Sequence, residues 1–152
     1  MIQRIQSIWF LLAAITTSTL FFVPFVTNQS PEKSFYINGL GLFEVVGDQS
    51  NKLASNSTFI LAIGILIAFY LFAIFQYKNR KLQKMIGLLA NFFALGIAYW
   101  SSQLAKTIPG SIESRTIEPG LFIPAMAIVF CLLAIRAIKQ DEKLLKSADR
   151  LR

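Results

Sequence analysis

Charged residues divide the chain into four long segments that carry no charge. These segments are 5–31, 53–77, 85–105 and 119–135. A helix needs about 20 predominantly apolar residues to cross the hydrocarbon core of a bilayer. The pattern therefore predicts four transmembrane helices, near residues 5–26, 57–77, 84–105 and 119–139.

The fourth and first segments depart from the ordinary pattern in different ways. The fourth is short, and we expect Arg136 to extend its guanidinium to the headgroups while its stem stays apolar. The first resembles a signal peptide, but its apolar run is longer than the hydrophobic region of such a peptide. No small-x-small cleavage site follows it at 24–28, so we expect it to be retained as a helix.

The connection between the first two predicted helices, residues 27–56, contains a candidate β-hairpin. Apolar residues flank Asn38-Gly39, a pair that tolerates the positive φ angles of a two-residue turn. An isolated two-stranded hairpin is only marginally stable in water. We therefore expect Phe35, Tyr36 and Phe43 to pack on the mouth of the helical bundle or against a partner.

These patterns predict an all-α membrane protein with one small β-hairpin, folded as a single domain over residues 1–152. The four helices would form a bundle whose seams carry small residues, because lipid gives no hydrophobic reward for helix association. Asn91 and Thr17 are the polar residues deepest in these seams, and we expect them to form hydrogen bonds between helices. In the last segment, residues 140–152, apolar residues form one stripe and basic residues occupy the other faces, a pattern that predicts an amphipathic cytoplasmic helix.

The distribution of basic residues predicts the orientation of the chain. The sequence has 15 Lys and Arg against 8 Asp and Glu, and 55% of its residues are hydrophobic. Eleven of the basic residues flank one set of helix ends and four flank the other. The positive-inside rule places the set of eleven, and both termini, on the cytoplasmic side of the membrane. This basic face is more typical of contact with anionic lipid than of docking to an acidic protein or to RNA, and we expect no nucleic-acid partner.

The residue types give little support for catalysis. The sequence has no His and a single Cys, so it lacks the usual general base near neutral pH and Cys/His metal clusters. All eight carboxylates lie outside the predicted helices. We therefore expect a protein that is not an enzyme and that holds neither a metal nor a cofactor.

Four short motifs together resemble a known family. They are the start Met1–Gln6, the turn Tyr77–Gln83, the segment Leu121–Pro124 and the ending from Arg136 to Arg152. Across its whole length the chain is similar to a family of small integral membrane proteins of the Bacteroidota that is described as a domain of unknown function. The resemblance implies four helices in the bacterial inner membrane, and it implies no activity or catalytic residue.

These observations favour a non-catalytic accessory subunit of a larger inner-membrane complex, such as a protein-translocation, envelope-biogenesis or respiratory assembly. Its partners would be membrane lipids and integral membrane proteins, bound through the outer loop and the basic cytoplasmic face. The cytoplasmic candidates for partner binding are Arg4, Lys78, Asn79, Arg80, Arg136, Asp141, Glu142, Asp149 and Arg150. The same residue types also fit ion pairs that merely fix the helices. The alternative function is a small carrier or a protein that binds a lipid or quinone.

Overall fold

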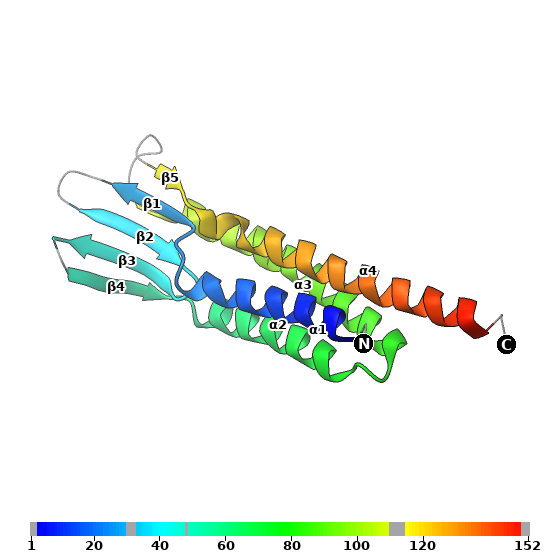
Figure 1. The fold of residues 1–152 in the computed structure, drawn as a ribbon. Coiled ribbons are helices and arrows are strands. Elements are labelled where there is room, and N and C mark those ends of the chain that lie inside the picture. Colours follow the sequence, from blue (N-terminus) through cyan, green and yellow to red (C-terminus); the bar gives the residue numbers. More distant parts are fainter. Residues whose placement is uncertain (1–2, 30–32, 48, 110–114, 150–152) are drawn as a thin grey trace.

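The structure is a computed structural model that describes residues 3–29, 33–47, 49–109 and 115–149. Its helices are α1 (Gln3–Ser18), α2 (Ser57–Phe75), α3 (Arg80–Lys106) and α4 (Ile123–Asp149), with short 3₁₀ segments η1 (Thr19–Phe21) and η3 (Pro119–Phe122). Its strands are β1 (Val26–Gln29), β2 (Ser34–Asn38), β3 (Gly41–Val46), β4 (Gln49–Ser55) and β5 (Arg115–Ile117). The helices lie side by side and the strands form a sheet at one end of them (Figure 1).

The predicted all-α fold is wrong, because the chain has a mixed α/β fold. The five strands form one antiparallel sheet in the order β4-β3-β2-β1-β5. The predicted hairpin is its β2–β3 pair, and polar segments on both sides add three more strands. β4 and β5 have no alternation of apolar and polar residues, because they lie at the edges and are mostly exposed. Their pairing therefore left no pattern in the sequence.

The turn between β2 and β3 also differs from the prediction by one residue. Asn38 pairs with Gly41, so the two residues of the turn are Gly39 and Leu40 rather than Asn38 and Gly39. The Asn38 side chain accepts a hydrogen bond of 2.9 Å from the backbone N–H of Leu40, which is the local bond that favours Asn before a turn. The N–H of Gly39 donates to the carbonyl of Leu20 over 2.8 Å and joins this turn to the end of the first helix.

Three helices of the described chain, rather than the predicted four, are long and apolar enough to cross a membrane. They are Ser57–Phe75, Arg80–Lys106 and Pro119–Leu144, whereas the apolar helix at Ile5–Phe21 is shorter. The last turns of this first helix are rich in hydroxyl side chains that bond to their own backbone. Thr17 and Ser18 donate to the carbonyls of Ala13 and Ala14, a pattern that often bends helices.

The four helices pack in a ring, in which α1 contacts α2 and α4, and α3 contacts the same two helices. We call this part of the molecule the helical body. Its interior combines small residues with a few large rings: Ala13, Ala90, Ala94, Ala127, Cys131 and Ala134 lie with Phe10, Phe59 and Tyr70. Small residues let the helix backbones approach closely, as the sequence predicts. α4 continues without a break to Asp149, so most of the predicted tail is its last turns.

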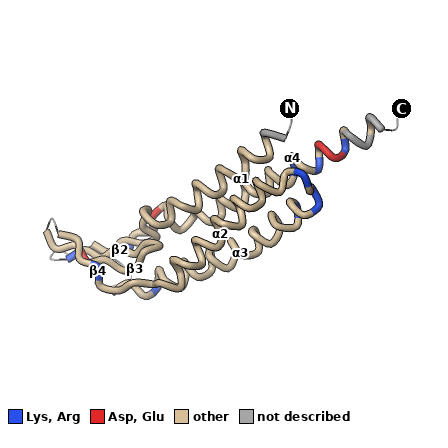
Figure 2. The backbone as a smooth tube through the Cα atoms, turned by 90° about the horizontal axis from the view of Figure 1, so that it is seen from below, with Lys and Arg blue, Asp and Glu red and all other residues tan. Residues whose placement is uncertain are grey.

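The two faces of the sheet have different surroundings. Val26, Asn28 and Ile37 point to one face and are buried against the helical body and the segment that follows α3. On the opposite face, the strand pairing aligns Thr27, Tyr36, Phe43 and Lys52 in one row across four strands. We call this second side the open face. The strands run roughly along the helices, so that the sheet extends the long axis of the molecule (Figures 1 and 2).

We predict that Gly120→Ala destabilises the protein, because η3, which leads into α4, lies directly on the segment that leads out of α1. A Cβ atom at Gly120 would overlap with the carbonyl group of Pro24, well inside van der Waals contact. The expected loss is about 1–3 kcal/mol of unfolding free energy, measured by thermal unfolding in detergent. Gly64→Ala is the matched control, since no described atom lies within 4 Å of a Cβ at Gly64. Equal melting temperatures for the two variants would contradict this account.

Candidate functional site

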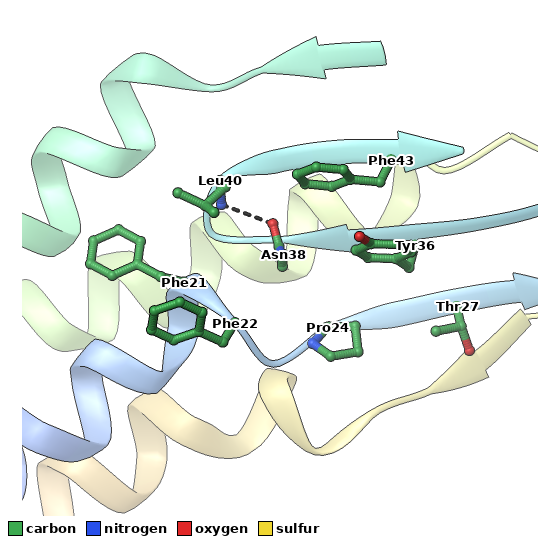
Figure 3. A pocket seen from close by; sticks show the side chains of 8 residues that line it. All are labelled: Phe21, Phe22, Pro24, Thr27, Tyr36, Asn38, Leu40 and Phe43. Atoms are coloured by element: carbon green, nitrogen blue, oxygen red, sulfur yellow. Dashed lines mark hydrogen bonds between the residues drawn. The ribbon is translucent and has the colours of Figure 1, made fainter. Parts of the chain in front are cut away.

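A cavity of about 540 Å³ lies where the sheet meets the end of α1. We call it the junction groove. The four lining residues nearest the helices are Phe21, Phe22, Pro24 and Leu40, and the four that belong to the sheet are Thr27, Tyr36, Asn38 and Phe43 (Figure 3). Most of this lining is apolar. Its volume falls within the roughly 300–1,000 Å³ that is typical of pockets for small ligands, and its shape is an open groove rather than an enclosed cavity.

The chain path out of α1 forms the helical side of the groove. After η1 the backbone turns at Pro24, and Phe25 enters the sheet by donating to the carbonyl of Ile37 over 2.7 Å. This turn leaves Phe22 on the surface with 77% of its area exposed. Phe22 therefore adds an exposed apolar ring to the helical side of the groove.

The open face of the sheet forms the other side of the groove. The rings of Tyr36 and Phe43 stack with 4.9 Å between their centroids and 4° between their planes. The ammonium group of Lys52 lies 5.8 Å from the centroid of the Phe43 ring, in cation–π range. At the opposite side the hydroxyl of Thr27 donates to the carboxylate of Glu118 over 2.9 Å. Tyr36 and Phe43 thus give the groove an aromatic floor. Lys52 lies next to Phe43 at one side, and Glu118 lies next to Thr27 at the other, although neither residue lines the groove itself.

A second polar site lies at the other end of the helical body. The amide of Gln6 donates a hydrogen bond to the carboxylate of Asp141, which is only 5% exposed. Beside it Lys84 and Glu142 form an ion pair of 2.7 Å. We call these four residues the polar cluster. It ties α1 and the start of α3 to the last turns of α4.

The cytoplasmic candidates for partner binding differ in whether they contact other parts of the fold or are exposed. Asp141 and Glu142 belong to the polar cluster, while Lys78 and Arg136 are exposed to the surroundings. Asn79 caps α3 by accepting a hydrogen bond of 3.2 Å from the N–H of Leu82. Arg80, the first residue of α3, is half-buried. The other three candidates are not assessed by the structure: it does not describe the side chains of Arg4 and Asp149, and Arg150 lies outside the described residues. Gln6 ties the last turns of α4 to α1, and Lys84 ties them to the start of α3; neither residue was among the candidates named from the sequence.

The aromatic candidates of the outer segment are also divided. Tyr36 and Phe43 line the junction groove, whereas Phe35 lies on the opposite face of the sheet and packs against the core. Sequence reasoning missed Phe21, Phe22 and Lys52. Phe21 and Phe22 precede β1 and Lys52 lies on β4, and only the pairing of β1 with β2 and of β3 with β4 brings these segments together. No local pattern in the sequence could therefore have identified these three residues.

Thr17 and Asn91, the two polar residues predicted to form hydrogen bonds between helices, differ in their hydrogen bonding. Thr17 bonds to the carbonyl of Ala13 in its own helix over 2.8 Å, rather than to another helix. Asn91 is buried, and its side-chain nitrogen and oxygen have no hydrogen-bond partner among the described residues. The interhelical contact nearby is made by Cys131, whose thiol lies 3.3 Å from the carbonyl of Gly87. Within the ranges that the structure describes, no group of three or more His, Cys, Asp or Glu is arranged to hold a metal ion.

A comparison with protein families shows what the chain is similar to. The model of a family described as a domain of unknown function (DUF4293) matches residues 2–151, which is nearly the whole chain. No curated protein matches the chain. The matched range includes every helix and strand given above, so both the junction groove and the polar cluster lie within it.

We predict that Asp141→Ala destabilises the protein, because it leaves the buried amide of Gln6 without an acceptor. An unsatisfied buried polar group costs about 1–3 kcal/mol, and we expect a loss of that size in unfolding free energy. Asp141→Asn is the control, since its side-chain oxygen still accepts from Gln6 and should retain most of the stability. Chemical unfolding in detergent measures both variants, and equal losses for Ala and Asn would show that this hydrogen bond is not what holds the helices.

Proposed function

Since the chain belongs to this family, whose description assigns no activity, we propose from its geometry that it is a non-catalytic accessory subunit of a larger assembly in the bacterial inner membrane. In this proposal the helices anchor the protein, the sheet stands outside the cytoplasm, and a partner protein adds a strand to the exposed edge at β4. The observation that carries the proposal is the edge position and full exposure of β4. It is an edge strand, paired on one side only by β3, and all seven of its residues are exposed.

An exposed edge strand is a template for another strand, because its outward N–H and C=O groups are unpaired. Peptide recognition by strand addition uses these groups for affinity. β4 is seven residues long and accessible along its full length, whereas the opposite edge, β5, has only three residues. β4 is therefore the edge on which a partner strand gains the most hydrogen bonds.

The proposed orientation is supported by the distribution of charge. Lys and Arg gather at the turn between α2 and α3 and along the last turns of α4, at the end of the molecule away from the sheet (Figure 2). Basic residues in short connections favour the cytoplasmic side of a membrane. The sheet then lies on the opposite side, where it can meet proteins of the cell envelope.

Geometry argues that the partner is a different protein rather than a second copy. Two copies that paired their β4 strands antiparallel would be related by a twofold axis perpendicular to the sheet. Because the strands run along the helices, that axis would lie in the plane of the membrane (Figure 1). It would turn the second copy upside down, against the charge distribution that sets the orientation.

The carboxylates of the described residues also support an accessory role. Glu44 pairs with Lys33 over 2.8 Å, Glu142 pairs with Lys84, Glu118 accepts from Thr27, and Asp141 accepts from Gln6. Each of these four acids therefore has a structural partner within the fold. The arrangement supports a protein whose charges hold its own elements in place.

We test the proposal by placing a photo-crosslinking amino acid at Ser50, an exposed residue of β4, in native membranes. We expect one crosslinked partner of defined mass, identified by mass spectrometry, because a strand added to β4 would lie beside this position. The same probe at Thr116, exposed on β5, is the control and should give no such product. Equal products from both positions, or none from Ser50, would contradict the proposal.

A substitution at the β4 bulge provides an independent test. Leu53 has no partner on β3, because the register passes from Lys52 to Ala54 there, so proline should be tolerated without loss of the β3–β4 pairing. Proline removes an N–H and adds a ring at the edge, and we expect Leu53→Pro to reduce the partner recovered in a mild-detergent pull-down about tenfold. Leu53→Ala retains the N–H and should behave as wild type. Full recovery of the partner by the proline variant would exclude this edge as the docking site.

A further inference from the structure

We infer that the junction groove binds one anionic phospholipid, with the acyl chains at the helical side and the phosphate beside Lys52. This site is separate from the edge of β4 on which the proposed function rests. It depends on the sheet lying at the outer surface of the membrane, as proposed above. The argument uses the position of the groove, the change of polarity along it, and the charges at its two sides.

The groove lies at the level where lipid is present. Exposed aromatic residues mark the end of the helical body that carries the sheet: Phe22, Tyr99, Trp100 and Phe122. The amphipathic rings of Tyr99 and Trp100 are of the kind that is enriched at membrane–water interfaces, where headgroups meet acyl chains. Phe22, an exposed apolar ring at this end of the helical body, also lines the groove, so acyl chains of the outer leaflet can reach the groove from this side.

The polarity along the groove changes in the same direction as the polarity of a phospholipid. The residues nearest the helices, Phe21, Phe22 and Leu40, offer only apolar surface (Figure 3). Farther out, Tyr36 brings a phenolic hydroxyl, and Lys52 follows next to Phe43. A lipid of the outer leaflet can therefore enter without inversion, with its chains toward the membrane and its headgroup toward the sheet.

The charges decide which side of the groove takes the headgroup. Three strand spacings, about 14 Å in total, separate Thr27 from Lys52 along the row on the open face. The carboxylate of Glu118 is bound to Thr27 at one end of this row, and it would repel a phosphate there. Lys52 provides the favourable charge at the other end. Lys33 is paired with Glu44 on the opposite face of the sheet, so it does not share this role.

The test uses the full chain in nanodiscs that contain equal amounts of phosphatidylglycerol and phosphatidylcholine, followed by native mass spectrometry. We expect one retained phospholipid per chain, enriched in the anionic phosphatidylglycerol. Lys52→Gln should lower the phosphatidylglycerol adduct about fivefold, because one lysine near a membrane surface contributes this much attraction. Lys106→Gln is the matched control, since Lys106 is exposed at the end of α3, whereas Lys52 lies over the ring of Phe43, which lines the groove.

A second pair of variants tests the apolar side. Phe22→Ser removes an exposed ring that lines the groove. Because apolar contact with the acyl chains is lost, we expect it to lower the phosphatidylglycerol adduct and the phosphatidylcholine adduct alike, each roughly fivefold. Phe122→Ser is its control, with 62% exposure and no place in the lining. Should Phe22→Ser fail to fold, the two lysine variants still decide the matter.

Three outcomes would overturn the inference. They are a wild-type chain without a lipid adduct, a dimer in place of the adduct, and equal adducts in all the variants. Crosslinking at Ser50 reports on the edge of β4 alone, so a failure of the lipid site is distinguishable from a failure of the partner site.

Discussion

The backbone of residues 20–25 is the connection on which the rest of the structure depends. The carbonyl of Leu20 accepts from Gly39 over 2.8 Å, and the carbonyl of Pro24 accepts from Gly120 over 3.1 Å. Phe25 accepts from Glu118 over 3.0 Å and donates to Ile37. Buried backbone groups must find partners, and here they find them in β2, in the β2–β3 turn and in Glu118 and Gly120 at the start of η3. The position of the sheet on the helices, and hence the groove between them, follows from these four bonds.

The two proposed sites can coexist on a small sheet because they use different parts of it. A partner strand would use the outward backbone groups of β4, whereas the lipid would use side chains on the open face. Lys52 belongs to both β4 and the lipid site. Its side chain lies on the open face, beside Phe43, whereas its backbone is part of the β4 edge. Addition of a strand would extend the floor of the groove instead of closing it. The geometry therefore permits a partner and a lipid to be bound at once.

The two ends of the helical body are held by different chemistry. At the sheet end, backbone hydrogen bonds and aromatic contacts predominate, including the edge-on contact of Phe59 with Trp100 at 5.4 Å. At the other end, the Gln6–Asp141 hydrogen bond and the Lys84–Glu142 ion pair join helices that are far apart in the chain. A buried polar pair is favourable only when both members are satisfied. The polar cluster thus fixes the relative position of the helices more specifically than small apolar contacts do.

The sequence by itself determined the helical part of this protein. Long uncharged apolar runs predicted α2, α3 and α4 to within a few residues at most ends, because length and apolarity are local properties that spanning a membrane requires. It also predicted the β2–β3 hairpin from Asn38-Gly39. Only the tertiary structure decided where α1 ends, because residues 22–26 turn away to pair with the sheet. It likewise decided the presence of β4 and β5, whose polar residues pair through backbone groups that leave no periodic pattern. The row from Thr27 to Lys52, and the groove above it, exist because strand register aligns residues that are far apart in the chain.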